Sequence, residues 1–332
     1  MDLQTLWFIV IAVLFTGYFI LEGFDFGVGM VLPFLGRGRE GERRRDAAVT
    51  TIGPVWDGNE VWLITAGGAL FAAFPEWYAT MFSGFYLPLL LILVALILRG
   101  VALEWRTKVS TDRWRRYSDL GIGIGSWVPA FLWGVAFANL VHGVPVDAAR
   151  QVPSGIDGLL GLLNPFGLLG GLAFVVLFLL HGVTFLALKT EGPLRERVHR
   201  IGRAVLIPVF ALVGGFTVWL QLAHGRPETW AAVAVLAISL LTTAGFLLAG
   251  RDGPAFSSTM VAILSLGALI FGSMFPHLMP TTLADGVSLD IWNSSSSDYT
   301  LTIMSWAALL IVPAVLVAQG WTYWSFRRRV SA

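Results

Sequence analysis

Long apolar segments recur along the whole chain and are separated by short polar connections. Segments of about eighteen or more apolar residues can cross a hydrocarbon core of about 30 Å as helices. The pattern predicts about nine membrane-spanning helices, over residues 6–33, 50–73, 79–103, 119–141, 164–188, 203–222, 229–249, 257–276 and 299–325. We therefore expect an all-α integral membrane protein, with one polytopic membrane domain over residues 1–332 built as two four-helix bundles plus one extra helix.

The composition agrees with this interpretation. Hydrophobic residues make up 56% of the chain and charged residues 13%, against about 45–50% and 25% in a soluble domain. No polar stretch is long enough for a soluble domain, and the first apolar segment is too long for a signal-peptide core, so we expect it to be retained. The chain has no cysteine, which excludes disulfides, thiolate-bound metals and thiol catalysis. No nucleic-acid partner is expected.

Basic residues are distributed unevenly between the two sides of the predicted membrane domain. Of the 22 Lys and Arg residues, 19 follow odd-numbered spans, while Arg150 and Arg226 lie on the other side and Arg99 lies inside the third span. Because basic loops face the cytoplasm, we predict an external N-terminus and a cytoplasmic C-terminus. Tyr323, near the end of the last span, is interpreted as part of the inner interfacial aromatic belt.

Four carboxyl groups fall inside predicted spans. Glu22 and Asp25 lie on the first span, and Asp57 and Glu60 lie on the second. A spacing of three residues places both members of a pair on one face of a helix, and a charged group at mid-membrane costs about 2.5–3.5 kcal/mol on insertion scales. Counted from the cytoplasmic end, the four lie at depths from about 10 Å to about 17 Å. They predict a proton path that enters the membrane from the cytoplasm and stops near its middle.

Two other interpretations of these acids stay open at this point. They could be structural partners of Arg99, which could also pair with Glu104 at the interface. Alternatively, the chain could be an independent ion-coupled carrier whose acids bind a cation. Carriers are usually built from internal repeats with interrupted helices in both halves, and the second half of this chain contains no acid inside a span.

The histidines argue against a redox centre within this chain. Haem iron needs axial ligands such as imidazole or thioether groups, and His181 is the one histidine deep inside a predicted span. His142, His224 and His277 fall at the outer surface, and His199 falls in an inner basic loop. One imidazole cannot form a bis-histidine site, so we interpret His181 as a polar packing residue and predict no metal ligands in this chain.

The segments around the acidic pairs resemble subunit II of the cytochrome bd quinol oxidases. Residues 23–29 read Gly-Phe-Asp-Phe-Gly-Val-Gly, and residues 56–68 read Trp-Asp-Gly-Asn-Glu-Val-Trp-Leu-Ile-Thr-Ala-Gly-Gly. The resemblance continues through residues 82–86, 134–137, 164–169 and 294–302, and so covers nearly the whole chain.

This resemblance implies a haem-free subunit of a heterodimeric terminal oxidase in the bacterial cytoplasmic membrane. Such a complex oxidises quinol at the outer face and reduces dioxygen to water with cytoplasmic protons. Haems b558, b595 and d are expected in subunit I, and small single-span subunits, a structural quinone or lipid are compatible with the family. The sequence does not distinguish ubiquinol from menaquinol.

The resemblance also suggests roles for particular residues. Acids that match Asp25 and Asp57 belong to the family's proton route, and a tryptophan that matches Trp62 lies near a hydrophobic oxygen passage. Family members vary at the position of Glu60, where a neutral amide can stand, and Glu22 can be replaced by another acid. A purely structural or assembly role for the chain is the remaining alternative.

Overall fold

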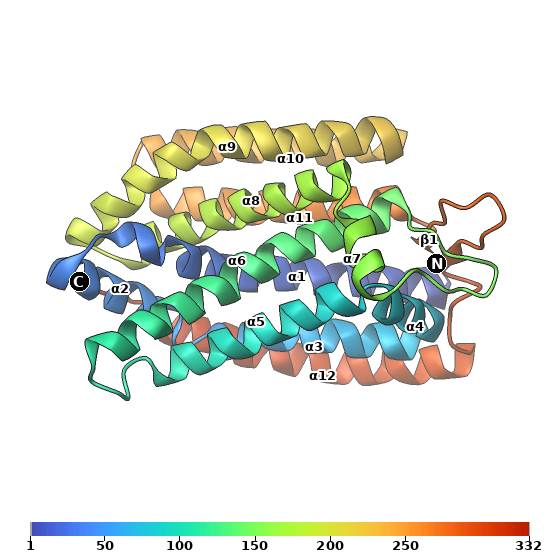
Figure 1. The fold of residues 1–332 in the computed structure, drawn as a ribbon, viewed down its shortest axis with the longest axis horizontal. Coiled ribbons are helices and arrows are strands. Elements are labelled where there is room, and N and C mark those ends of the chain that lie inside the picture. The colour runs from blue at the N-terminus through green and yellow to red at the C-terminus, as the bar shows by residue number, and fades with distance from the viewer. Residues whose placement is uncertain (1, 332) are drawn as a thin grey trace.

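The computed structural model describes residues 2–331, which form twelve α-helices, two 3₁₀ turns and one small hairpin (Figure 1). The helices are α1 (Leu3–Val31), α2 (Gly38–Ile52), α3 (Trp56–Ala73), α4 (Pro75–Gly84), α5 (Tyr86–Trp105), α6 (Asp112–His142), α7 (Gly155–Leu162), α8 (Pro165–Lys189), α9 (Gly192–His224), α10 (Trp230–Leu248), α11 (Asp252–Met274) and α12 (Asp298–Ser325). The 3₁₀ turns are η1 (Leu32–Leu35) and η2 (Pro227–Thr229), and strands β1 (His277–Met279) and β2 (Leu289–Asp290) pair antiparallel.

The long helices run side by side, and their contacts divide them into two sets. In one set α1 contacts α3 and α6, and α6 contacts α5; in the other α8, α9, α10 and α11 pack together. α12 lies along the outer side against α1 and α3 (Figure 1). An extensive interface of α8 with α1 and α6 joins the two sets into one body.

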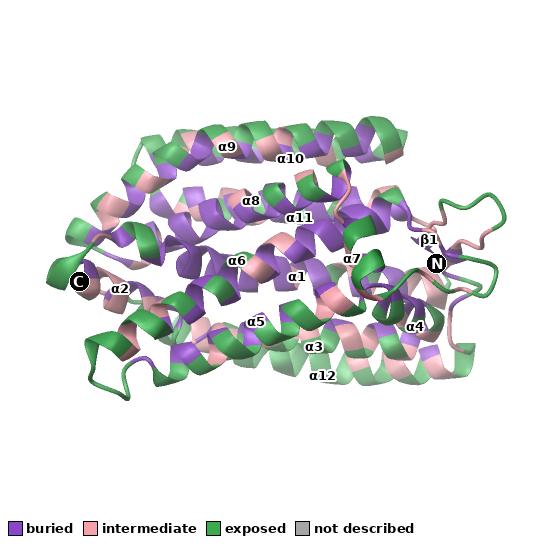
Figure 2. Cartoon of the chain, in the orientation of Figure 1, coloured by how far each residue is buried: buried purple, intermediate pink, exposed green. Residues whose placement is uncertain are grey.

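Burial differs sharply between the centre and the edge of this body. α8 is almost entirely enclosed, whereas α12 is exposed along nearly its whole length (Figure 2). Leu301 is the buried residue of α12, and large apolar side chains such as Leu310 and Val317 are exposed. An apolar helix this exposed needs lipid or another protein around it.

Glycines permit the close helix contacts at the centre. A Cβ on Gly27 of α1 would lie 2.1 Å from the carbonyl oxygen of Phe178 and 2.6 Å from Cα of Gly182. A Cβ on Gly134 of α6 would meet the backbone of Gly170 at 2.4 Å. Small residues therefore bring the backbones of α1, α6 and α8 together, which is the usual basis of helix packing in membranes.

Eight helices within residues 2–331 are long and apolar enough to cross a membrane. Eight of the nine predicted spans correspond to these eight helices. The remaining span, predicted over residues 50–73, corresponds to α3. α3 has 18 residues, or about 27 Å at 1.5 Å per residue, but its first turns carry Asp57, Asn59 and Glu60. Nine crossings and the orientation of the chain therefore stay predictions, although α2 and the C-terminus do share one end (Figure 1).

Two of the predicted spans are wrong as continuous helices, because each is divided between two helices. The span predicted over residues 50–73 is divided, because α2 ends at Ile52 and α3 begins at Trp56 after a turn that contains Pro54. The span predicted over residues 79–103 is also divided, between α4 and α5. Pro88 has no N–H to bond the carbonyl of Gly84, so one continuous helix is disfavoured there. Both breaks lie beside apolar residues, so hydropathy does not detect them.

Candidate functional site

Two carboxyl groups and one guanidinium are enclosed between α1 and α5. Glu22 and Asp25 are 0% exposed, and Arg99 is 1% exposed. Arg99 Nη1 donates to Glu22 Oε1, and Arg99 Nη2 lies 4.0 Å from Asp25 Oδ2. Arg99 therefore lies beside both acids, as one interpretation of the sequence expected. We call Glu22, Asp25 and Arg99 the acidic cluster.

Local packing brings Arg99 to this place. A Cβ on Gly125 of α6 would lie 2.3 Å from Cβ of Arg99, so the glycine lets α5 and α6 approach closely at this level. The guanidinium also lies over the ring of Phe26, with Cζ 4.9 Å from the ring centre. A cation above an aromatic face is attracted to it, and more strongly where water is excluded. Arg99 is therefore held inside the bundle and directed toward α1.

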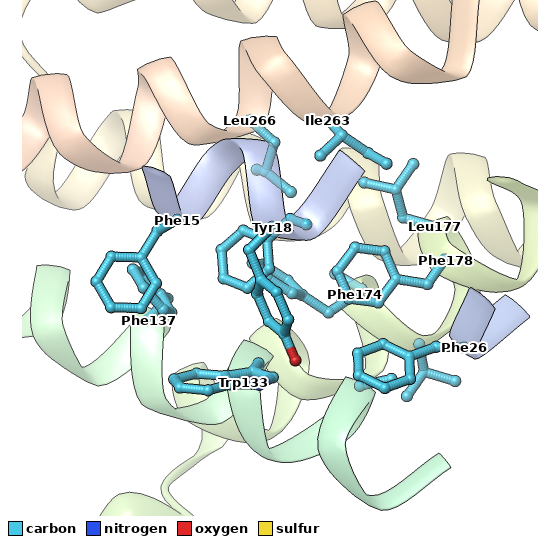
Figure 3. Packing of buried hydrophobic residues seen from close by; sticks show 14 of the residues in the cluster. Phe15, Tyr18, Phe26, Trp133, Phe137, Phe174, Leu177, Phe178, Ile263 and Leu266 are labelled. Atoms are coloured by element: carbon cyan, nitrogen blue, oxygen red, sulfur yellow. The ribbon is translucent and has the colours of Figure 1, made fainter. Parts of the chain in front are cut away.

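Aromatic side chains pack together beside the acidic cluster, and Figure 3 shows Tyr18, Phe26 and Trp133 among them. Tyr18, one turn before Glu22, packs edge-on against Phe26 at 6.3 Å and Trp133 at 6.0 Å between ring centres. Phe19, on the next position of α1, packs against Phe174 at 5.2 Å. These rings exclude water from one side of the cluster, which strengthens the electrostatic interactions within it.

Several polar atoms of the acidic cluster have no hydrogen-bond partner among residues 2–331. They are Glu22 Oε2, Asp25 Oδ1, and Nε and Nη2 of Arg99. Buried polar atoms are nearly always hydrogen-bonded, and exceptions call for a physical explanation such as bound water or a chemical role. The unpaired oxygens are sites where a proton or a water molecule would be stabilised.

Asn59 of α3 extends the acidic cluster. It is 0% exposed, and its Nδ2 donates to Asp25 Oδ2 at 2.7 Å and to the carbonyl of Leu21 at 3.3 Å. Its Oδ1 accepts a hydrogen bond from the hydroxyl of Tyr323 at 2.6 Å. The sequence interpretation overlooked Asn59, because a neutral amide beside two acids gives no charge signal. Its position between Asp57 and Glu60 was the one available indication.

α12 supplies the outer part of the same network. Gln319 Nε2 donates to Asn59 Oδ1 at 3.4 Å, and Gln319 Oε1 accepts from the indole N–H of Trp62 at 2.8 Å. A continuous series of polar contacts therefore links Glu22 to Trp62 across α1, α5, α3 and α12. Tyr323 belongs to this network as well as lying near a helix end, so the belt interpretation described it incompletely.

Asp57 and Glu60, the second predicted acidic pair, do not belong to the acidic cluster. Glu60 is half-buried, and Asp57 is exposed on the surface of the chain. Asp57 Oδ1 accepts a hydrogen bond from the backbone N–H of Gly58 at 2.8 Å, in the first turn of α3. Within residues 2–331 no side chain forms a hydrogen bond or ion pair with either carboxyl group. Glu22 and Asp25 are therefore fully buried, Glu60 is partly exposed, and Asp57 lies on the surface.

The alternative pairing of Arg99 with Glu104 is wrong. Glu104 is exposed and lies 3.6 Å from Lys108 Nζ, one helical turn further along. Arg99 and Glu104 are five positions apart on α5, which places them on different faces of the helix. Arg99 faces inward and Glu104 faces outward.

Trp62 lies at the edge of an apolar groove. Its ring packs on Gly17, where a Cβ would be 2.3 Å from the indole. The groove has a volume of about 640 Å³ and runs between α1 and α11, with Ala12 and Ala268 among its lining residues. Its walls contain no charged side chain.

The histidines within residues 2–331 do not fit a haem. His181 is fully buried, but Nδ1 faces Thr259 Oγ1 at 2.7 Å and Nε2 faces the carbonyl of Ile20 at 2.9 Å. Its ring stacks on Phe256 at 4.8 Å, as expected for a packing residue. His142 and His224 meet directly at 3.2 Å, which leaves no room for a macrocycle between their ring nitrogens.

The sequence matches a known family along almost its whole length. The sequence profile of the family described as cytochrome bd terminal oxidase subunit II matches residues 3–326. Cytochrome bd ubiquinol oxidase subunit 2 of Bacillus subtilis (strain 168) is 41% identical over 335 residues, which cover 99% of this chain and 97% of that protein. Cytochrome bd-I ubiquinol oxidase subunit 2 of Escherichia coli (strain K12) is 38% identical over 368 residues, with 99% and 95% covered.

The fold is also similar to that of a solved structure. A chain of the bd oxidase from Geobacillus thermodenitrificans superposes with a TM-score of 0.74 and covers 96% of this chain and 98% of that chain. The two sequences are 19% identical in this superposition. The likeness therefore concerns the fold.

Proposed function

Because this chain belongs to the cytochrome bd terminal oxidase subunit II family, we propose that its acidic cluster holds and passes protons for the oxygen reduction that the complex performs. The chain is a multi-pass membrane subunit of a quinol oxidase, an oxidoreductase. This assignment replaces the interpretation as an independent carrier. We place the complex in the bacterial cytoplasmic membrane, with the haems in subunit I and with single-span subunits, lipid or quinone as further components.

One observation carries the proposal. Two carboxyl groups that are 0% exposed share a single guanidinium that is 1% exposed. If both were ionised, the cluster would hold one uncompensated negative charge in a water-excluded interior, at a cost of several kcal/mol. The cluster therefore favours one bound proton, and Arg99 stabilises whichever carboxyl group is ionised. A site with one proton and two carboxyl groups can accept and release that proton in turn.

The remaining acids supply a path from the cytoplasmic end of α3. Asp57 is exposed, Glu60 on the next turn is half-buried, and Asn59 between them contacts Asp25 at 2.7 Å. An amide cannot itself carry a proton at neutral pH, but it can orient the carboxyl group and any water beside it. In our proposal protons enter near Asp57, pass by Glu60 and reach Asp25 and Glu22.

The exposure of Asp57 indicates where the partner subunit binds. A carboxylate on a lipid-facing surface is costly, and the same side of the chain presents Ile64, which is 72% exposed, and Phe71, which is 59% exposed. α12 adds further exposed apolar surface beside α3. We propose that subunit I covers this face, so that Asp57 lies at the boundary between the two subunits.

The experiment is to replace Asp25 or Asp57 by Asn in the purified complex. We expect oxygen consumption to fall at least about tenfold, since a positioned proton donor contributes about 10²–10⁴ to a rate, while haem absorption and subunit ratio stay unchanged. Glu104→Gln is the matched control, because Glu104 is an exposed acid that pairs only with Lys108. Loss of the haem bands together with activity would support the purely structural role, and normal activity of both variants would contradict the proposal.

The groove beside Trp62 favours a second function as an oxygen passage. Dioxygen is apolar and concentrates in lipid, and the groove offers it an uncharged path of about 640 Å³ that begins at the bundle surface. Ala268 lines this groove at an exposed position of α11. We expect Ala268→Phe to raise the KM for dioxygen without changing kcat at saturating dioxygen. An unchanged KM would exclude this groove as the entry route.

A further inference from the structure

Two histidines that are distant in sequence meet at the end of the bundle that we predict to be external. His142 is the last residue of α6 and His224 is the last residue of α9. Nδ1 of His142 lies 3.2 Å from Nε2 of His224, and the two ring planes are at 87°. We propose that these two imidazoles form a binding site for a divalent transition-metal ion.

The distance between the two nitrogens fits a shared metal. Imidazole nitrogens bind zinc at about 2.0–2.1 Å, so two of them in neighbouring positions of a tetrahedral or octahedral ion lie about 2.9–3.4 Å apart. The observed separation of 3.2 Å falls within this range. Without metal, one of the two facing nitrogens carries the proton of a hydrogen bond. With metal, each ring places its proton on its other nitrogen, so binding needs a change of tautomer and no further base.

Packing holds the two rings in place. Both contact Phe166 near the start of α8, at 5.7 Å for His142 and 5.4 Å for His224 between ring centres. Trp219 also packs against Phe166, at 5.4 Å between ring centres. Because α8 lies between α6 and α9, the aromatic contacts fix both helix ends relative to it. Such preorganisation reduces the entropy lost when a metal binds.

The site is open to ions from the aqueous side. His142 is exposed, and it lines a hollow of about 250 Å³ together with Asp157 of α7. The hollow has room for water molecules that would complete the coordination of the metal. Asp157 adds a negative charge to the lining of this hollow, which favours a cation there without direct coordination.

The donor atoms indicate which metal is preferred. Imidazole suits Zn²⁺, Ni²⁺ and Cu²⁺, and for a given nitrogen site Cu²⁺ binds most tightly. Residues 2–331 contain no group of three or more His, Cys, Asp or Glu side chains arranged around one ion. The site therefore has two protein ligands and water in its other positions. It takes up metal reversibly and links the ends of α6 and α9.

Copper binding to the purified complex tests this inference. After chelator treatment, the complex is titrated with Cu²⁺ and electron paramagnetic resonance is recorded. We expect one Cu²⁺ per copy of this chain with nitrogen couplings from two imidazoles. His142→Gln and His224→Gln should each remove one set of couplings and weaken binding at least about tenfold, as loss of metal-supporting groups commonly does. His277→Gln is the matched control, since His277 is another exposed histidine at the same end.

A second measurement separates metal binding from loss of fold. Zn²⁺ should raise the Tm of the complex, because a ligand that binds only the native state stabilises it, and this rise should be absent when both His142 and His224 are replaced by Gln. Haem absorption confirms that each variant has assembled. Unchanged copper couplings and affinity in both single variants, or an equal loss in His277→Gln, would overturn the proposal.

Discussion

Two arginines of the same helix are buried to the same degree but have different surroundings. Arg99 in the middle of α5 and Arg106 directly after its last residue are each 1% exposed. Arg106 Nε donates to Asp119 Oδ1 at 2.7 Å, and Nη1 donates to Asp46. Arg99 meets Glu22 and Asp25 in the sealed interior, whereas Asp46 is 40% exposed. Arg99 therefore lies in a cluster closed to solvent, whereas Arg106 lies in a cluster that solvent partly reaches.

The two clusters also differ in their count of charges. Around Arg106 the arginines and the acids are equal in number. We call these six residues the Arg106 cluster: Arg45, Arg106, Arg115, Glu42, Asp46 and Asp119. Burial alone would lower the pKa of Arg106, but the hydrogen bonds and charges of Asp119 and Asp46 outweigh burial and raise its pKa above its usual value. Arg106 therefore stays charged at every accessible pH.

The comparison suggests what would distinguish a structural ion cluster from the proton-holding cluster that we propose. In the Arg106 cluster every acid is matched by an arginine, and Asp46 is partly exposed to solvent. In the acidic cluster two carboxyl groups share one cation and are closed off from bulk solvent. An exchangeable proton is the simplest way to restore neutrality there. In our proposal the number of acids per arginine and the access of solvent decide which role a cluster has.

Removing the central cation should have the largest effect. Arg99→Leu leaves Glu22 and Asp25 buried without a cation, and breaking a buried ion pair on one side costs about 3–5 kcal/mol. We expect poor assembly of the complex and a strongly lowered Tm. Adding Glu22→Gln to Arg99→Leu should recover part of the lost stability. If the single variant were as stable as the wild type, the cluster would not be held together by charge.

Replacement of Arg106 should cost less. Arg106→Leu removes charge-assisted hydrogen bonds worth about 1.5–3 kcal/mol, and the lower end applies because water can solvate Asp46. Denaturation of the complex should show this loss, while turnover per haem in the assembled complex stays the same. A fall in turnover at constant haem content would indicate that the Arg106 cluster also handles protons.

Neutralising one acid of the acidic cluster should separate stability from activity. Glu22→Gln leaves Asp25 and Arg99 as a balanced pair, so we expect the complex to assemble with an unchanged Tm. Oxygen consumption should fall about tenfold, which corresponds to about 1.4 kcal/mol in the activation free energy, because the exchangeable proton is lost. Normal turnover with normal assembly would mean that Glu22 is a structural partner of Arg99.

The smallest effect is expected at the outer part of the network. Tyr323→Phe removes the hydroxyl that donates to Asn59 at 2.6 Å, and a single hydrogen bond contributes about 1 kcal/mol. We expect a small decrease in Tm and about a twofold decrease in oxygen consumption, measured beside Tyr299→Phe. Tyr299 is 77% exposed on the same helix. A tenfold fall in rate would place Tyr323 on the proton path itself.

Sequence reasoning located the charges better than it located their surroundings. Glu22, Asp25 and Arg99 stand out because ionisable groups are rare in apolar spans, and spacing along a helix places both acids on one face. Asn59 and Gln319 did not stand out, since neutral amides hardly disturb a hydropathy pattern. The exposure of Asp57 depends on how α3 is rotated against α1, which only tertiary packing determines.

The fold was likewise predicted only in part: the long helices were found, but the breaks between them and the contacts distant in sequence were not. Length and apolar character were enough for the long helices, such as α8 and α11. The breaks at Gly53 to Val55 and at Phe85 were missed, because the residues directly beside them, such as Ile52, Trp56 and Tyr86, are apolar and a window average runs across them. The contact between His142 and His224 joins positions 82 residues apart, and no local pattern encodes it.

The most direct test asks whether the acidic cluster holds a proton at neutral pH. Infrared difference spectroscopy of the intact complex detects the C=O stretch of a protonated carboxyl group and its shift on deuterium exchange. We predict one such band at pH 7 that disappears in Glu22→Gln and in Asp25→Asn and persists in Glu104→Gln. A spectrum without this band in the wild type, or with the band unchanged in both variants, would contradict the account.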